Sequence, residues 1–426
     1  MKKFIQLFSL LPLLFSCGQQ QKTDFIYPMY RIQVTIDPED QFLDVSGQLT
    51  IPADKVSDTV SLYLHRQFDI LQFSLNGNSN FALDTSGSGI RYLPEAVKIY
   101  FVPEAEDPLK AAVINFSYSG RITERPKWLA NVISEEWTEI GLYFPWFPFH
   151  PDLRPLEYQL DVEIDTAFKV FAMGIKSENG STVRFSTGYP TNDIVVCAAK
   201  DLKLESTTVA GNDFHLGYYS LQPHVVDSVM MDIEFMYSKY NDWFGRKDGS
   251  MYLAESKRKS GGAYGRLGGL FLPGFEEAGY LEYRTGYLRY LGHELAHNWW
   301  YRADSDTWHD WLNECFAEYS ALILIREKSG RDEFNRRIES YIAGMDTLPP
   351  LWNLNRSHDY AYPVLYRKGP VLLSELEDRM GEYDFKIFCW ELVASGADET
   401  DDLLAVLRRQ QGGEAAEWFE TLLKTR

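Results

Sequence analysis

The chain has little cysteine, no excess of basic residues and no long apolar run after its first residues. Its 426 residues include four cysteines, and the three that follow Cys17 are widely spaced, so we expect no disulfide framework. The formal net charge is −19, which argues against a nucleic-acid partner because phosphate binding needs a basic face. No later stretch has the roughly 18 consecutive apolar residues of a membrane-spanning helix.

The first 17 residues have the composition of an export signal. Two lysines precede an apolar run that is too short to cross a bilayer. The Leu-Phe-Ser-Cys sequence that ends at Cys17 resembles a bacterial lipoprotein box, which implies cleavage before Cys17, lipidation of this residue and a tether over 18–24. An ordinary signal peptide with an incidental cysteine is the alternative. We predict an exported bacterial lipoprotein, anchored to the membrane by lipid and facing the periplasm or the cell surface.

The rest of the chain divides into two parts with different periodicity. Apolar residues make up 45% of the sequence, which is typical of a globular protein with two or three domains. Residues 25–205 show strand-like alternation and Gly or Pro turns, and they predict an antiparallel β-sandwich or saddle-shaped domain. Residues 206–426 show mainly helical patterns, beginning with Val225–Phe244. The predicted fold class is α+β, with the β domain first.

The strongest motif is a pair of histidines, His293 and His297, with Glu294 directly after the first. On a helix, residues four apart share one face, so both imidazoles can point at one ion. Two neutral imidazoles at this spacing suit zinc, and the adjacent carboxylate suits a general base for a zinc-bound water. A helix that merely carries two structural histidines is the alternative explanation.

A catalytic zinc needs a third protein ligand, and Glu314 is the candidate. It lies in the aromatic-rich segment WLNECFAEY, 17 residues after His297, which leaves room for a turn and a second helix. Glu318 lies one helical turn further on. It is placed to accept the outer N–H of a zinc-bound histidine and thereby to fix its tautomer.

Three segments together, HELAHNWW, WLNECFAEY and LYRKG, resemble the aminopeptidase-N-like family of gluzincin zinc metallopeptidases. The resemblance covers most of the C-terminal half, although the loop before Glu314 is shorter than is usual in the family. It implies one Zn²⁺ held by His293, His297 and Glu314, Glu294 as the base and Tyr366 as a catalytic tyrosine. It also implies a thermolysin-like catalytic domain over 206–426, without the large C-terminal helical domain of longer members.

The chain departs from the family at the edge strand before the zinc helix. Members usually carry a Gly-x-Met-Glu-Asn motif there, whose glutamate holds the free α-amine of the substrate. Here Gly262, Ala263 and Tyr264 are followed by glycine and Arg266, so no carboxylate is evident. The strand remains a candidate for binding a peptide backbone as an added strand. Arg266 either favours an acidic substrate group or is solvated.

Four residues outside this strand are further candidates for contact with substrate. The segment 135–152 combines aromatic residues, prolines and acids, and it is either a buried hinge or a border of the cleft. If it borders the cleft, Glu135, Glu136 or Glu139 is the candidate replacement for the missing amine-binding glutamate. Tyr362, four residues before Tyr366, is a candidate second phenol in the cleft.

The predicted function is zinc-dependent hydrolysis of peptide bonds, with a peptide as the partner in solution. The resemblance favours an aminopeptidase that releases N-terminal residues. The missing glutamate keeps open a zinc endopeptidase or a hydrolase of a non-peptide substrate. A surface lipoprotein that binds ligands without catalysis is the remaining alternative.

Overall fold

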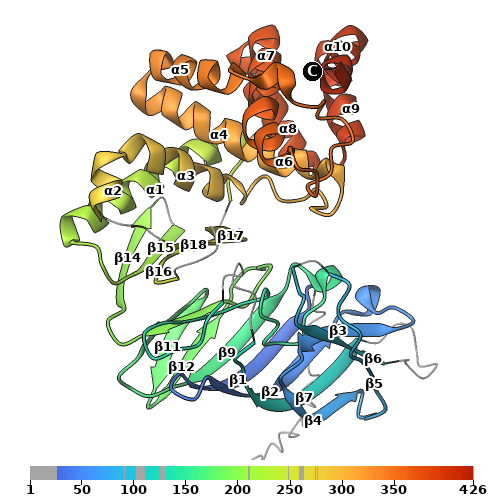
Figure 1. The fold of residues 1–426 in the computed structure, drawn as a ribbon, viewed down its shortest axis with the longest axis vertical. Helices are drawn as coiled ribbons and strands as arrows, with labels where there is room; N and C mark the ends of the chain where they lie inside the picture. The colour runs from blue at the N-terminus through green and yellow to red at the C-terminus, as the bar shows by residue number, and fades with distance from the viewer. Residues whose placement is uncertain are drawn as a thin grey trace, which may run out of the picture.

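The fold was analysed in a computed structural model of the 426-residue chain. It describes residues 26–425 except 91, 102–110, 125–130, 210–211, 248, 259–262, 274 and 276. The segment 1–17, the tether and Gly262 therefore lie outside the described residues. Strands gather in the N-terminal half and helices in the C-terminal half (Figure 1).

The N-terminal half is built on a seven-stranded sheet. Its order is β11 (Ile175–Asn179), β12 (Thr182–Ser186), β9 (Glu157–Glu163), β1 (Met29–Asp37), β2 (Phe42–Ile51), β7 (Ala112–Arg121) and β4 (Asp69–Leu75). Neighbouring strands are antiparallel except β1 and β9, which run parallel, so the purely antiparallel expectation is wrong for this pair. Residues of β1 and β7 alternate between buried and more accessible positions, which is the period-two pattern of a sheet with one face on the core.

Two three-stranded sheets complete this half. One contains β3 (Val60–His65), β6 (Ala96–Phe101) and β5 (Ala82–Asp84), and the other contains β10 (Lys169–Ala172), β13 (Val196–Ala199) and β8 (Thr138–Ile140). The short 3₁₀ helices are η1 (Ala53–Lys55) and η2 (Pro151–Leu153). The second of these sheets packs against the catalytic half. Its residues Phe171 and Cys197 share a buried apolar cluster with Tyr252 and Phe271.

The C-terminal half begins with a mixed five-stranded sheet. Its order is β14 (Lys203–Val209), β15 (Asn212–Tyr218), β16 (Met251–Ser256), β18 (Gly269–Pro273) and β17 (Tyr264–Arg266). The domain boundary placed after residue 205 falls inside β14. Strand β17 is at the edge of this sheet and lies between the helices and the β domain (Figure 1).

Helices form the rest of the molecule, above the strands in Figure 1. They are α1 (Pro223–Phe244), α2 (Glu277–Glu282), α3 (Arg284–Ala296), α4 (Trp311–Ser329), α5 (Arg331–Ile342), α6 (Ala361–Pro363), α7 (Gly369–Met380), α8 (Glu382–Ser395), α9 (Thr400–Gln411) and α10 (Gly413–Thr425). The short 3₁₀ helices η3 (Trp308–Asp310) and η4 (Met345–Thr347) and the π-helix η5 (Val364–Lys368) lie between them. Helix α4 is buried from Trp311 to Arg326, as expected of a helix that is apolar on most faces. Among the described residues, no helix is long and apolar enough to cross a membrane.

Candidate active site

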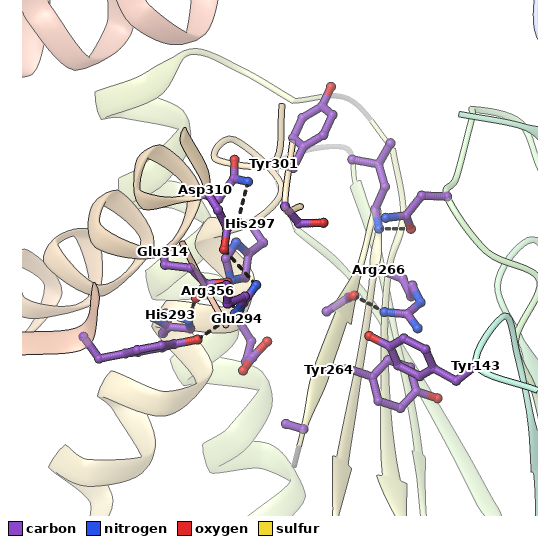
Figure 2. Close-up of a pocket in the computed structure, with 17 residues that line it drawn as sticks. Tyr143, Tyr264, Arg266, His293, Glu294, His297, Tyr301, Asp310, Glu314 and Arg356 are labelled. Carbon is purple, nitrogen blue, oxygen red and sulfur yellow. Dashed lines mark hydrogen bonds and ion pairs between the residues drawn. The ribbon is translucent and has the colours of Figure 1, made fainter. Parts of the chain in front are cut away.

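A cavity of about 260 Å³ lies where the β domain meets the catalytic half (Figure 2). One wall comes from α3, α4 and the segment before α6, and the other comes from β17 and two residues of the N-terminal half. It is lined by Tyr143, Asn192, Ala263, Tyr264, Gly265, Arg266, Leu267, His293, Glu294, His297, Tyr301, Ser305, Asp310, Asn313, Glu314, Arg356 and Tyr366.

Close packing of α3 on α4 brings the two histidines to Glu314. A Cβ at Gly292 would lie 2.8 Å from Leu324 Cδ1 of α4, so glycine lets the two helices pack closely without a shift of Leu324. Helix α3 ends at Ala296, and His297 is its C-cap, but His297 keeps helical backbone angles. The four-residue spacing therefore still places both rings on the face that looks toward α4.

Three ligand atoms converge at this point. Glu314 Oε2 lies 3.4 Å from His293 Nε2 and 3.9 Å from His297 Nε2. Ligands held about 2.0 Å from one zinc in a tetrahedron are about 3.3 Å apart, so these separations are close to those of a zinc site. Glu314 Oε2 is buried and accepts no hydrogen bond from a described residue. The three side chains thus fit a zinc ion, and a fourth position can face the cavity.

Neighbouring groups fix the orientation of both imidazoles. Glu318 Oε2 lies 3.1 Å from His293 Nδ1, and Glu318 is itself held by Arg289 and by the hydroxyl of Tyr341 at 2.6 Å. His297 Nδ1 lies 2.9 Å from the carbonyl oxygen of Trp300. A carbonyl can only accept, so Nδ1 carries the proton and the Nε2 lone pair faces Glu314.

Without a bound metal, the carboxylates of Glu314 and Glu318 favour the protonated form of His293. Burial lowers the pKa of His293, but the ion pairs with Glu314 and Glu318 outweigh burial and raise the pKa to about 10. A bound divalent cation takes the place of that proton, because a zinc ligand must be neutral imidazole.

Glu294 lines the cavity beside the ligands, close to strand β17. A Cβ at Gly265 would lie 3.5 Å from Glu294 Oε2. Gly265 therefore leaves the carboxylate open to the cavity, where a longer side chain would fill the space. This placement suits a base that takes a proton from a water at the metal position.

Tyr366 stands on the other side of His293. Its ring stacks on that of His293 with centroids 5.3 Å apart, and Tyr362 stacks on its outer face at 4.7 Å. Burial raises the pKa of Tyr366, so the phenol keeps its proton at neutral pH. Its oxygen accepts a hydrogen bond from Arg356 at 3.2 Å.

Arg356 is a site residue that sequence reasoning missed. Its guanidinium donates to Glu314 Oε1 at 2.7 Å and pairs with the buried carboxylate of Asp310 at 2.9 Å. Burial raises the pKa of Asp310 to about 7. Arg356 lies in the loop between η4 and α6, far from any motif, so only its proximity to Glu314 in space reveals it.

The structure does not bring the candidate acids of the N-terminal half to the cavity. Glu135 and Glu136 are exposed, and Glu135 pairs with Lys200 on the surface. Glu139 is fully buried and is engaged by Arg258 and by the Tyr264 hydroxyl, so it holds the two halves of the molecule together. None of the three is among the described residues that line the cavity.

The remaining substrate-contact candidates differ in their positions. Ala263 and Tyr264 line the cavity, whereas Tyr362 is 62% exposed and does not line it. Arg266 is neither solvated nor free to pair fully with an acid, since its Nε donates to Asp193 at 2.6 Å and its side chain is 6% exposed. Gly262 lies outside the described residues.

No protein-family model and no curated protein sequence matches the chain, but solved structures do. An M1 zinc metallopeptidase from Deinococcus radiodurans, a variant bound to a Tyr-Ser-Ala substrate, is similar with a TM-score of 0.71 and 19% identity over 94% of each chain. A two-domain M1 zinc metallopeptidase variant bound to L-arginine has the same TM-score, identity and coverage. Leukotriene A4 hydrolase from Saccharomyces cerevisiae has a TM-score of 0.67 and 16% identity, over 94% of this chain and 68% of the yeast chain.

These similarities define the fold. The chain has the two-domain fold of the M1 zinc metallopeptidases, with a multi-sheet β domain followed by a helical domain, and the predicted α+β class is confirmed. The first two of these structural neighbours are zinc metallopeptidases, and the HELAH and WLNECFAEY segments also resemble zinc metallopeptidases. The match along nearly the whole length of the D. radiodurans chain is to a short, two-domain form of this fold.

Proposed function

We propose that this protein is a zinc-dependent metallopeptidase that hydrolyses peptide bonds. The observation that carries the proposal is the convergence of His293, His297 and Glu314 beside Glu294. Their three ligand atoms all lie within 4.8 Å of one another, at the wall of an open cavity. The shared fold of zinc metallopeptidases supports the same reading.

Glu294, Tyr366 and Arg356 each have a separate role in the proposed reaction. A bound zinc would polarise the substrate carbonyl and acidify a coordinated water. Glu294 takes the proton of the attacking water and passes it to the leaving amine. Tyr366 keeps its proton and donates it in a hydrogen bond to the oxygen that gains negative charge. Arg356 holds the Tyr366 oxygen and the outer oxygen of Glu314 in place.

Two finer versions of this function have different support. Removal of N-terminal residues is supported by the motifs and by the similarity to a metallopeptidase that binds a tripeptide substrate. Cleavage at internal bonds is favoured by the cavity itself. The acids among its described lining residues are Glu294, Asp310 and Glu314, and all three lie on the metal side.

The function is tested with a mixed peptide library, the full-length protein in detergent and mass spectrometry of the products. We expect cleavage that stops with a chelator and returns with Zn²⁺. Glu294→Gln should keep one zinc per chain but lose activity by roughly a thousandfold, because the base is gone while the ligands remain. Zinc-loaded protein that cleaves no peptide would contradict the proposal.

We also propose that the protein is an exported lipoprotein, on the basis of the sequence that ends at Cys17. Cells that express wild-type protein and Cys17→Ala would be labelled with a radioactive fatty acid and fractionated. Label and membrane association should both be lost in the variant. Equal labelling of the two would contradict lipidation at Cys17.

A further inference from the structure

The wall of the cavity opposite the metal ligands offers N–H donors, and none of its described lining residues is a carboxylate. It is formed by Tyr143, Asn192 and the β17 residues. Figure 2 shows Tyr143, Tyr264 and Arg266 across the cavity from His293. The carboxylates lie on the metal side, where Glu314 is a ligand, Asp310 is held by Arg356 and Glu294 stands beside the ligands. A substrate ammonium placed beside Arg266 and Asn192 would face N–H donors rather than an acceptor.

Arg266 supplies the first donor. The guanidinium lies between two rings, with Cζ 4.6 Å from the centroid of Tyr143 and 4.4 Å from that of Tyr264. Nε donates to Asp193 and Nη1 donates to the carbonyl oxygen of Gly265 at 2.8 Å. No described residue accepts a hydrogen bond from Nη2, although the side chain is more than nine-tenths buried and lines the cavity.

Asn192 supplies the second donor. Its Oδ1 accepts a hydrogen bond from the backbone N–H of Leu267 at 2.9 Å, which fixes the orientation of the amide. The Nδ2 group therefore points away from Leu267, and no described residue accepts from it. Asn192 and Arg266 come from different halves of the molecule and meet at the same wall.

The charge of Arg266 determines which acceptor suits this wall. Asp193 is fully buried, and its second oxygen accepts from the backbone N–H of Leu142 at 2.8 Å. The ion pair is thus complete and its net charge is zero. A neutral carbonyl oxygen matches the open N–H groups without adding an unpaired charge, whereas a second carboxylate would crowd Asp193 and an ammonium would face donors.

We infer that Arg266 and Asn192 form a subsite for an amide carbonyl oxygen of the substrate. The substrate class is therefore a peptide that is acylated at its amino terminus or cleaved at an internal bond. This inference rests on the proposed peptidase function and decides between its two finer versions. It makes Arg266 and Asn192 specificity-determining residues that contact substrate.

The test compares one mixed peptide library in two forms, with free and with N-acetylated amino termini. Full-length, zinc-loaded protein in detergent should cleave the acetylated form with at least about a tenfold higher kcat/KM. Faster cleavage of the free form would overturn the subsite.

Two variants probe the donors separately. Arg266→Lys keeps the positive charge beside Asp193 but loses the second terminal donor, and should lower kcat/KM about tenfold more on the acetylated library than on the free library. Asn192→Asp keeps the acceptor for Leu267 but replaces the cavity-facing donor with an anion, and should shift preference toward the free library. Equal losses on both libraries would indicate a merely structural role.

Folding and function are separated by two further measurements. Thermal unfolding of each variant identifies any that fails to fold, and the second variant then tests the subsite alone. If wild-type protein cleaves neither library, the proposed function fails. The subsite is then tested by retention of both libraries on immobilised, zinc-loaded Glu294→Gln protein. Preferential retention of the acetylated form supports the subsite, and equal retention overturns it.

Discussion

At the scale of single residues, Arg356 links Glu314 to Tyr366 in the catalytic cluster. One terminal nitrogen of its guanidinium contacts both the outer oxygen of Glu314 and the oxygen of Tyr366. Burial and the neighbouring Glu314 carboxylate both raise the pKa of the Tyr366 phenol. Arg356 therefore acts as a positioning residue, through Tyr366 and Glu314.

We predict strong coupling between Arg356 and Tyr366. Tyr366→Phe should lower kcat by roughly 100- to 1000-fold, because it removes the donor to the oxyanion. Arg356→Gln should lower kcat by about tenfold with KM little changed. In the double variant the Arg356 change should have a smaller effect than it has alone, because the Tyr366 hydroxyl is gone and only the contacts with Glu314 and Asp310 remain to be lost. Losses that multiply would show that Arg356 acts independently of Tyr366.

His65 sets a pH dependence far from the active site. Its ring is buried, Nε2 lies 3.0 Å from the Glu124 carbonyl oxygen and Nδ1 accepts from the backbone N–H of Gln67. Both contacts are satisfied by the neutral ring. Burial lowers the pKa of His65 to about 4, so the unfolded chain binds a proton more readily than the folded chain between pH 6.5 and 4.

We therefore predict a loss of stability as the pH falls through this window. The contribution of His65 should be fully present above pH 6.5 and decrease by up to about 3 kcal/mol toward pH 4. Urea unfolding between pH 7 and 4 should show a shallower pH dependence for His65→Gln than for wild type. His224→Gln, at an exposed histidine, is the matched control, and identical slopes for all three proteins would contradict the prediction.

At the scale of elements, helix α4 depends on a buried ion pair. It carries Glu314 and Glu318, and near its C-terminal end Arg326 forms a two-pronged contact with Glu377 of α7, at 2.8 and 2.9 Å. Both side chains are almost completely buried. This contact ties the helix that carries the third ligand to the helix that follows Tyr366.

We predict that Arg326→Met lowers the free energy of unfolding by about 3–5 kcal/mol, because Glu377 is left as an uncompensated buried charge. Arg326→Met combined with Glu377→Leu should recover most of the loss, since no charge then remains. Denaturant unfolding of the two proteins measures the difference. A double variant as unstable as the single one would show that packing, rather than charge, accounts for the loss.

The sequence predicted most helices and strands of the catalytic half because apolar periodicity is a local property. Val225–Phe244 is helical as expected. Helix α5 ends at Ile342, and Gly344 has a left-handed backbone (φ 83°) that begins the separate turn η4. Helix ends depend on such single backbone angles more than on periodicity.

At the scale of the whole molecule, the two halves share one buried interface. Glu139 pairs with Arg258, and Asp193 pairs with Arg266, each across the boundary and each almost without exposure. The cavity is closed by side chains from both halves. The site is therefore complete only when the β domain and the catalytic half are docked.

We predict that zinc stabilises the whole fold, because it binds side chains that only the folded chain brings together. A chelator should lower the thermal midpoint, and a zinc concentration about 1,000 times the dissociation constant should add roughly 4 kcal/mol to the free energy of unfolding. Differential scanning calorimetry should show this shift in wild type and in Glu294→Gln. His297→Ala should not respond, and a response in this variant would place the metal elsewhere.

The sequence by itself determined the chemistry of one wall of the site. Helical spacing, which is local, links His293, Glu294 and His297 in one segment and Glu314 and Glu318 in the next, and the resemblance added Tyr366. Tertiary structure alone decided the opposite wall. Asn192 and Arg266 are far apart in the chain, and Glu139, which looked available, is buried against Arg258. Which polar groups face a cavity depends on how two domains pack, and no local pattern records that packing.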